Sequence, residues 1–474
     1  MLVVMLMGML AACGNAEPAA TTPNAPQAQT PAQEQATEAA VQSVGNFEVP
    51  EGGYDGSAVT ITFYNTMGAN LSAVLEAYIA EFNELYPNIT VVSENVGSYD
   101  DVRDRISTEI TVGNQPNIAY CYPDHVALYN LAKAVSTLDN LIDHPELGLT
   151  AEQKADFIEG YYNEGKQFGD GLMYTMPLSK STEVLYYNKT FFTENNLKVP
   201  TTWAEVEEVC KQIKAIDPNS IPLGYDSESN WFITMCEQYK SPYTSASGDH
   251  YLFNNDQNKA FIKMFRQWYE AGYLTTQKLY GAYTSGLFTS TNEVKSCMSI
   301  GSSAGATYQR PAANADGSYP FEVGIATIPQ VDAANPKVIS QGPSLCIFQK
   351  ANPQEVIASW LFVKYLTTSI EFQAEFSMAS GYVPVLKSVA TNPIYAEHLA
   401  SADGGNHISA LSSKVCLEQQ HAYYTSPAFN GSSTARDQVG ALLTKCLSAD
   451  ANGNVDAMID AAFKAAVDEC EYNG

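Results

Sequence analysis

Residues 58–64, Ala-Val-Thr-Ile-Thr-Phe-Tyr, alternate between apolar and polar side chains, as a half-buried β-strand does. Apolar residues then recur at helical spacing over residues 71–86, and Pro87 marks the end of that run. A second short strand follows at once, Ile89-Thr-Val-Val92. A strand, a helix and another strand in this order predict a βαβ unit and a parallel sheet.

The same alternation continues along the chain. Two α/β regions are expected, and the second begins near Met176-Pro177. Thr202-Trp-Ala-Glu205 predicts a capping box, in which a Thr hydroxyl and a Glu carboxylate bond free amides at a helix start. Further helices are predicted at 99–112, 229–239, 256–271, 353–379, 433–447 and 454–470, and further strands at 117–121, 183–188, 322–328 and 338–349. The pattern gives an α/β fold, and 474 residues allow two to four domains or two large lobes.

The chain is strongly acidic. It has 52 acidic and 25 basic side chains, a formal charge of −27. This charge argues against nucleic acid as a partner and against docking on an anionic membrane surface, because both would be repelled. Residues 1–102 hold 12 Asp or Glu, and the first basic residue is Arg103.

The N-terminal residues are typical of an export signal. Met1 to Leu10 is an apolar run too short to span a bilayer but suited to a signal peptide. Leu10-Ala-Ala-Cys13-Gly14 resembles the lipobox of bacterial lipoproteins, in which the Cys is lipidated and becomes the first mature residue. The basic start of such signals is missing, so we expect that the true start lies earlier or that the chain was trimmed. Residues 1–12 are thus assigned to the signal, and Cys13 to lipidation.

Residues 14–46 are mostly Ala, Thr, Pro, Gln and Glu, a composition that cannot bury enough apolar surface to fold. We therefore expect residues 13–56 to form a lipidated, flexible tether, with lipidated Cys13 as the only membrane attachment. The protein is then extracytoplasmic, held at the outer face of the bacterial cell membrane.

Cysteine spacing gives no sign of a metal site. Besides Cys13 there are eight Cys, without a C-x-x-C pair or a Cys/His cluster, and their disulfide state stays open. Asp450, Asn452, Asn454 and Asp456 have the spacing of a calcium loop. However, Val455 and Ala461 stand where such a loop needs Gly and Glu. No metal and no cofactor is expected.

One sequence matches a catalytic motif. Gly301-Ser302-Ser303-Ala304-Gly305 fits the G-x-S-x-G pattern, and it follows a strand-like run at 295–300. Asp332 and one of His398, His407 or His421 would complete a triad in the right chain order. A secreted serine hydrolase using Ser303 is therefore an alternative, although no Gly-rich oxyanion loop precedes the motif. The other interpretation is that Ser hydroxyls and backbone amides here bind a polar ligand, and that the protein is no enzyme.

Aromatic residues recur where predicted strands or turns end. They are Tyr64, Tyr99, Tyr122, Trp231, Tyr308 and Tyr382. Each alone would suit a core, but aromatic faces beside polar loop residues are what a sugar requires. The ring stacks on the C–H face while amides and hydroxyls bind the rim.

Seven segments, in this order and spacing, resemble family 1 of the bacterial extracellular solute-binding proteins, the carbohydrate and glycerol-phosphate group that captures solutes for ABC importers. The most specific is Met176-Pro-Leu-Ser-Lys-Ser-Thr-Glu-Val-Leu-Tyr-Tyr-Asn-Lys189. The others are residues 62–68, 82–89, 97–101, 112–117, 200–203 and 380–385. The resemblance covers residues 57–474.

The resemblance implies a periplasmic-binding-protein-like fold with two α/β lobes, a ligand cleft between them and several hinge crossovers. By analogy, lobe one takes residues 57–178 and 343–392, and lobe two takes residues 179–342 and 393–474. It also implies that a carbohydrate, a sugar or oligosaccharide, is captured by hinge closure and delivered to the membrane permease subunits of the importer. We expect a monomer.

Carried over position by position, the resemblance also implies a set of ligand contacts. These are Tyr64, Asn65, Tyr99, Tyr122, Asp124, Ser181, Thr182, Trp231, Ser302, Ser303, Gly342, Pro343 and Tyr382. Glycerol-phosphate binders of this family carry an Arg in the loop before a late helix, whereas residues 425–431 here have none and the first Arg is Arg436. A phosphate would lack its guanidinium partner, which favours a neutral sugar. Glycerol phosphate or a glycerophosphodiester is the alternative ligand.

Overall fold

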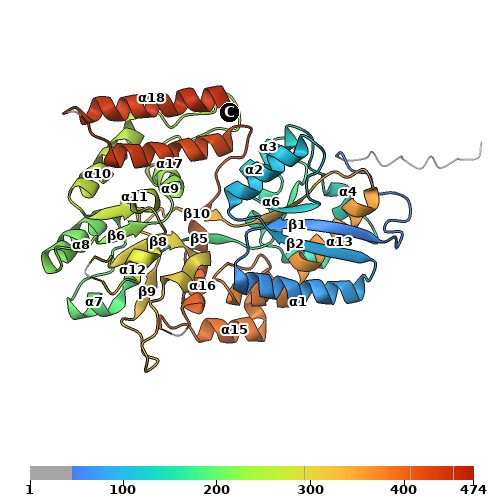
Figure 1. The fold of residues 1–474 in the computed structure, drawn as a ribbon, viewed down its shortest axis with the longest axis horizontal. Coiled ribbons are helices and arrows are strands. Elements are labelled where there is room, and N and C mark those ends of the chain that lie inside the picture. Colours follow the sequence, from blue (N-terminus) through green and yellow to red (C-terminus); the bar gives the residue numbers. More distant parts are fainter. Residues whose placement is uncertain (1–44, 293, 406, 452, 474) are drawn as a thin grey trace, which may run out of the picture. The chain divides into compact units, whose positions relative to one another are not determined.

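The computed structural model describes residues 45–292, 294–405, 407–451 and 453–473. These residues form one compact unit, whose ribbon is drawn in Figure 1. The expected signal segment, Cys13 and residues 14–44 of the expected tether lie outside the described residues.

The first βαβ unit confirms the prediction made from residues 58–92. β1 (Val59–Asn65) pairs in parallel with β2 (Ile89–Asn95), and α1 (Ala69–Leu85) connects them. α2 (Tyr99–Ile110) leads to β3 (Ile118–Cys121), which lies parallel to β1 on its other side. The apolar residues that alternate along β1 face the core as predicted, because Ile61 and Phe63 are fully buried.

A five-stranded sheet with the order β2-β1-β3-β11-β4 organises the first half of the unit. β11 runs antiparallel to both β3 and β4, so the sheet is mixed rather than wholly parallel. One core cluster packs α1, α13 and α14 against this sheet, and another packs α2 and α3. The remaining elements of this half are β4 (Thr175–Pro177), β11 (Ser344–Ile347), α3 (Pro123–Asn130), α4 (Asp139–Ile142), α5 (Ala151–Asp156), α6 (Glu159–Glu164), α13 (Pro353–Thr368), α14 (Ile370–Met378), η2 (Lys387–Thr391) and α15 (Pro393–Ala400).

A seven-stranded mixed sheet organises the second half, with the order β12-β10-β5-β8-β6-β7 and with β9 also paired to β5. α17 and α18 lie side by side (Figure 1) and share a core cluster with α8, α9 and α10. The predicted capping box at Thr202 and Glu205 is present at the start of α8. The elements of this half are β5 (Ser181–Asn188), β6 (Leu223–Tyr225), β7 (Leu274–Thr276), β8 (Met298–Ser302), β9 (Val323–Ala326), β10 (Val338–Gln341), β12 (Tyr423–Tyr424), α7 (Lys189–Glu194), α8 (Trp203–Ile216), α9 (Glu228–Tyr239), α10 (Asp256–Glu270), α11 (Gln277–Tyr280), α12 (Ser285–Phe288), η1 (Ser303–Gln309), α16 (Ile408–Glu418), η3 (Gln420–Ala422), α17 (Ser432–Ser448) and α18 (Val455–Asn473).

The single strand predicted at 338–349 is two strands in two different sheets. β10 pairs with β5 in the second sheet, and β11 pairs with β3 in the first, so the chain crosses between the halves at Gly342-Pro343. Gly342 has a φ of +119°, and a Cβ there would lie 2.6 Å from the Cα of Lys180. Lys180 belongs to the other crossover, from β4 to β5. The two crossovers therefore touch, and only glycine fits between them.

The predicted helix 353–379 is also divided. Ser369 has an extended backbone, with φ −79° and ψ 115°, and its side chain accepts a hydrogen bond from the Phe372 amide as the N-cap of α14. Apolar periodicity runs through this point because both helices pack on the same core. The cap, and not the pattern, sets the break.

Residues 46–54, which the sequence placed in the tether, contact the first half instead. Phe47 is 5% exposed and belongs to the core cluster of the first sheet. Asn46 donates from its side chain to the Val135 carbonyl at 2.9 Å and accepts from the Thr137 amide at 2.8 Å. The folded body therefore begins about ten residues before Ser57. The polar composition of this stretch did not indicate it, because only Asn46 and Phe47 supply these contacts.

Within the described residues, no helix combines the length and the apolar character needed to cross a bilayer.

Candidate functional site

A pocket of about 520 Å³, counting its open part, lies between the two halves next to the second crossover. The first half contributes residues that follow β3, and Glu164 from α6. The second half contributes the end of β10, the loop after β12 and the first turns of α17. Its polar and aromatic lining includes Tyr122, Asp124, Glu164, Tyr243, Ser340, Gln341, Thr425, Ser426, Ser432 and Arg436.

Stacked tyrosines form the wall on the side of the first half. Tyr122 caps the start of α3, and its ring stacks on Tyr99 with centroids 4.3 Å apart and planes at 20°. The hydroxyl of Tyr99 lies 3.4 Å from that of Tyr382. Burial raises the pKa of each of these three phenols, so they stay protonated and can donate hydrogen bonds. Asp124, in the first turn of α3, adds a carboxylate beside this aromatic wall.

Arg436 brings a guanidinium into the pocket from the second turn of α17. Its Nη2 donates to Oδ1 of Asn230 on α9. The Gln341 amide, oriented to satisfy its neighbours, accepts from Nη2 and Nη1 of Arg436 at 2.8 and 3.0 Å. A planar guanidinium held from two sides offers its remaining donors in a fixed direction.

Two hydroxyls that line the pocket have no hydrogen-bond partner among the described residues. The Oγ atoms of Ser340 and Ser426 are both buried, and Ser340 is only 4% exposed as a residue. Buried polar atoms are nearly always paired, so these two hydroxyls are suited to a ligand or to water. Together with Asp124 and Arg436 they supply donors and acceptors at several points of one small space.

A buried ion pair lies at the base of the pocket, where the crossovers meet. The Nζ of Lys180 donates to the carboxylate of Glu164, and their side chains are 1% and 4% exposed. Lys180 Nζ also lies 3.4 Å from Ser344 Oγ and 3.5 Å from the Gly342 carbonyl. One ammonium group thus joins α6 and both crossovers.

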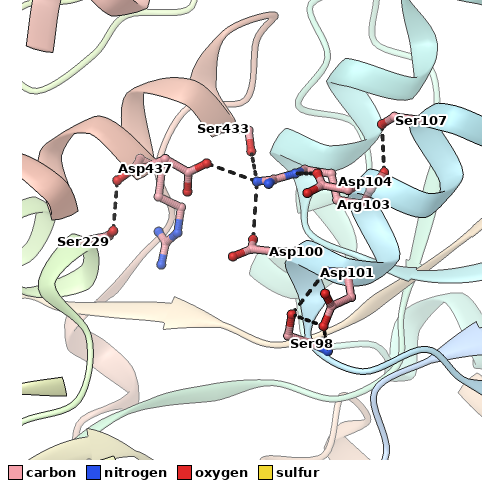
Figure 2. A network of polar contacts seen from close by, with 10 residues as sticks. Ser98, Asp100, Asp101, Arg103, Asp104, Ser107, Ser229, Ser433 and Asp437 are labelled. Atoms are coloured by element: carbon pink, nitrogen blue, oxygen red, sulfur yellow. Dashed lines mark hydrogen bonds and ion pairs between the residues drawn. The ribbon is translucent and has the colours of Figure 1, made fainter. Parts of the chain in front are cut away.

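A second, more open cavity continues from the pocket between α2 and α17. It shares Tyr122, Asp124 and Arg436 with the pocket, and it measures about 1360 Å³ with its open part. Arg103 of α2 bridges it to Ser433 and Asp437 of α17, as Figure 2 shows.

Comparison with known proteins shows the family to which the chain belongs. Residues 77–402 match the family model of the bacterial extracellular solute-binding proteins. The chain belongs to this family. It is similar to the sn-glycerol-3-phosphate-binding periplasmic protein UgpB of Escherichia coli, at 24% identity over 70% of this chain and 75% of that protein.

Solved structures show the same fold. UgpB from Mycobacterium tuberculosis, in complex with glycerophosphocholine, superposes with a TM-score of 0.71 at 18% identity, over 88% of this chain and 99% of that one. An ABC substrate-binding protein from Listeria monocytogenes, in complex with cycloalternan, gives 0.70 at 16% identity, over 87% and 98%. The two-lobed α/β fold expected from the sequence is thereby confirmed. The exact lobe boundaries stay a prediction. α15, which the prediction placed in lobe two, contributes Tyr395 to the core cluster of the first sheet.

The structure brings part of the predicted ligand set together. Tyr122, Asp124 and Gly342 line the pocket, and Tyr99 and Tyr382 adjoin it through the tyrosine wall. Other predicted residues lie at the crossovers or at the adjoining end of β8: Ser181, Thr182, Pro343, Ser302 and Ser303. Thr182 Oγ1 donates to the Ile339 carbonyl at 2.8 Å, and the Pro343 carbonyl accepts from the amide of Leu178 at 3.1 Å. Their roles as ligand contacts remain predictions.

Three predicted contacts lie elsewhere. Trp231 is fully buried in the core of the second half, with its ring stacked on Tyr225 at 4.7 Å. The guanidinium of Arg105 lies over the ring of Tyr64, with its Cζ 4.2 Å from the ring centroid, and Nη2 of Arg105 donates a hydrogen bond to the Tyr64 hydroxyl. Asn65 accepts from the Met67 amide in the turn after β1. In this conformation Tyr64 and Asn65 lie at the end of β1 and Trp231 lies on α9, and each side chain is used within its own half.

The Ser303 hydroxyl is not arranged as a nucleophile. The residue is fully buried, and its Oγ accepts a hydrogen bond from the Thr182 amide at 3.2 Å. Among the described residues, no hydrogen bond joins Ser303 to a His or to a carboxylate. The motif is a turn from β8 into η1, with Ser302 as the N-cap.

Arg436 is the main residue that sequence reasoning missed. It was noted only as the first Arg after the loop 425–431, and α17 turns it back into the pocket. The pocket therefore does contain a guanidinium that a phosphate could pair with, contrary to the expectation from residues 425–431. Gln341 adjoins the predicted Gly342, whereas Tyr243 and Glu164 come from segments without a sequence signal.

The eight described cysteines are buried thiols without disulfides. Burial raises the pKa of Cys210, Cys236 and Cys416, among others, which keeps these thiols protonated. In the described part of the chain, no group of three or more His, Cys, Asp or Glu residues is placed to hold a metal ion.

Proposed function

We propose that this protein is the extracytoplasmic solute-binding component of an ABC importer, and that it captures a carbohydrate in the pocket between its lobes. Family membership supports the class of function. The ligand assignment rests on the pocket. Aromatic faces, a carboxylate, a guanidinium and two unpaired hydroxyls converge there from both halves.

This mixture suits a neutral polyhydroxyl ligand. Hydroxyl groups both donate and accept, so Asp124 can accept from them while Arg436 donates to them. The tyrosine wall offers ring faces for the apolar side of a sugar. Because the lining comes from both halves, a bound sugar stabilises the form in which the halves are close, which the permease then recognises.

A glycerophosphodiester or glycerol phosphate is the second candidate. Arg436 lies in the pocket and could pair with a phosphate in a charge-assisted contact. The similarity to glycerol-phosphate-binding relatives points the same way. Asp124 lines the same pocket, no described residue gives it a cationic partner of the kind that Lys180 gives Glu164, and its carboxylate favours the neutral sugar.

A thermal-shift screen of the full chain separates the two ligands. Neutral mono- and oligosaccharides form one set, and glycerol 3-phosphate and glycerophosphocholine form the other. A ligand at 100 times its dissociation constant stabilises the folded form by about 2.7 kcal/mol. We expect a shift with a neutral sugar that is lost in Asp124→Asn. A shift with phosphorylated compounds alone, abolished by Arg436→Gln, would establish the second candidate.

A matched control is available far from the pocket. Lys263 forms an exposed ion pair with Asp456, at 2.6 Å, between α10 and α18. Lys263→Gln also removes one positive charge, but it should leave every ligand shift unchanged. Loss of the shift in this variant as well would show that the pocket variants act through stability.

The hydrolase alternative has its own test. Ester turnover by the purified chain that disappears in Ser303→Ala would overturn the proposal of a binding protein.

The lipid anchor is part of the proposal. Cys13 follows the lipobox-like Leu10-Ala-Ala, and a polar segment leads from it to the folded body. In a lipoprotein-making bacterium, the full chain should take up a labelled fatty acid and partition with membranes. Cys13→Ser should be released into the medium or remain as an unprocessed precursor.

A further inference from the structure

We propose that Arg103 is a latch residue, which holds the two lobes together at the rim of the cleft without contacting the solute. This proposal rests on the proposed function, since it concerns the closure that captures the solute. Arg103 lines the open cavity between α2 and α17, but it is not among the residues that line the pocket. Arg103 would change the affinity for the solute by holding the lobes together, and not by touching the solute.

The contacts of Arg103 cross from one half to the other. Its Nη1 donates to Ser433 Oγ at 3.1 Å and to Asp437 Oδ2 at 3.2 Å, both on α17. The same guanidinium stays tied to its own helix through Asp104 Oδ1 at 2.8 Å and Asp100 Oδ1 at 3.3 Å. Figure 2 shows this group between the acids of α2 and the first turns of α17.

Both helices that the latch joins are fixed within their own halves. α2 begins with a capping box between Ser98 and Asp101, and its Val102 and Ile106 are fully buried in a core cluster of the first half. On the other side, Ser229 Oγ donates to the Arg436 carbonyl at 2.9 Å and ties α17 to α9. Because neither helix can follow the other, opening the cleft must break the contacts of Arg103 with Ser433 and Asp437.

The pair is half-buried. The Arg103 side chain is 14% exposed, whereas that of Asp437 is 52% exposed. Burial raises the pKa of Asp437 and the positive charge of Arg103 lowers it, so Arg103 stabilises the charged carboxylate while the lobes are together. A pair of this kind changes an equilibrium by several-fold, and high salt screens it.

Ligand-free full-length protein provides the test, so failure of the solute assignment cannot mimic failure of the latch. Small-angle scattering reports the radius of gyration of wild type, Arg103→Gln, Asp437→Asn and the double variant. We expect each single variant to be larger than wild type and the double variant to be no larger than the singles. In 1 M NaCl, wild type should expand toward the variants, which should not change further.

Lys263→Gln serves as the matched control, because it breaks an ion pair between two helices of the same half. It should keep the wild-type radius. Circular dichroism verifies that each variant is folded, and Asp437→Asn keeps the test open should Arg103→Gln fail to fold. A wild-type radius in both single variants, or an equal expansion in the control, would overturn the latch.

Discussion

The buried pair of Lys180 and Glu164 offers a sharp test of how the crossovers are held. Replacing Lys180 by Met keeps the length of the side chain but removes its charge. It leaves the Glu164 carboxylate, 4% exposed, without its ammonium partner. Breaking one side of a buried pair costs about 3–5 kcal/mol of unfolding free energy, because the remaining charge is uncompensated.

The assay is urea unfolding of the full chain at pH 7, with the double variant Glu164→Gln/Lys180→Met beside the single ones. Removing both charges should recover more than half of the loss, since the buried pair contributes little beyond its own desolvation. A loss below about 1 kcal/mol, or strictly additive variants, would refute this account of the pair.

Three further predictions concern other buried positions. Burial raises the pKa of Glu183 from the usual 4.5 to about 7. The folded state therefore holds this proton more tightly than the unfolded state, and the resulting contribution to the unfolding free energy is present below pH 4.5 and is lost as the pH rises to 7. Glu183→Gln should remove about 3 kcal/mol of that pH dependence in urea unfolding, and an unchanged slope would contradict it. Gly342→Ala should cost at least about 2 kcal/mol, because of its positive φ and the clash with Lys180, and an equally stable variant would disprove that constraint. Trp231→Ala should lower the unfolding free energy by about 3–5 kcal/mol, because the ring fills the core. A variant with full stability and lost ligand affinity would show instead that Trp231 contacts the ligand.

Local order in the chain was predictable where periodicity and caps agree. The strand 58–64, the helix 71–86 and the Thr202 capping box all appear close to their expected places. Periodicity failed where one apolar run serves two elements. The run 338–349 contains β10 and β11, which belong to different sheets, and Ser369 divides the run 353–379.

The pocket shows a similar division. Tyr122 and Asp124 were predicted from the family resemblance, Tyr122 also as an aromatic residue at a strand end, and both line the pocket. Trp231 was predicted for its ring, yet the ring belongs to the core. An aromatic side chain can pack in a core or contact a ligand. Which of these it does depends on the direction in which the backbone orients it.

The sequence alone determined the alternation of strands and helices, the net charge and the family, because each follows from the kinds and order of residues along the chain. Only the tertiary structure decided which side chains meet. Arg436 reaches Gln341 across 95 positions, Arg103 reaches Asp437 across 334, and Lys180 reaches Glu164 beneath both crossovers. Such meetings depend on how whole sheets pack, and no local spacing records that arrangement.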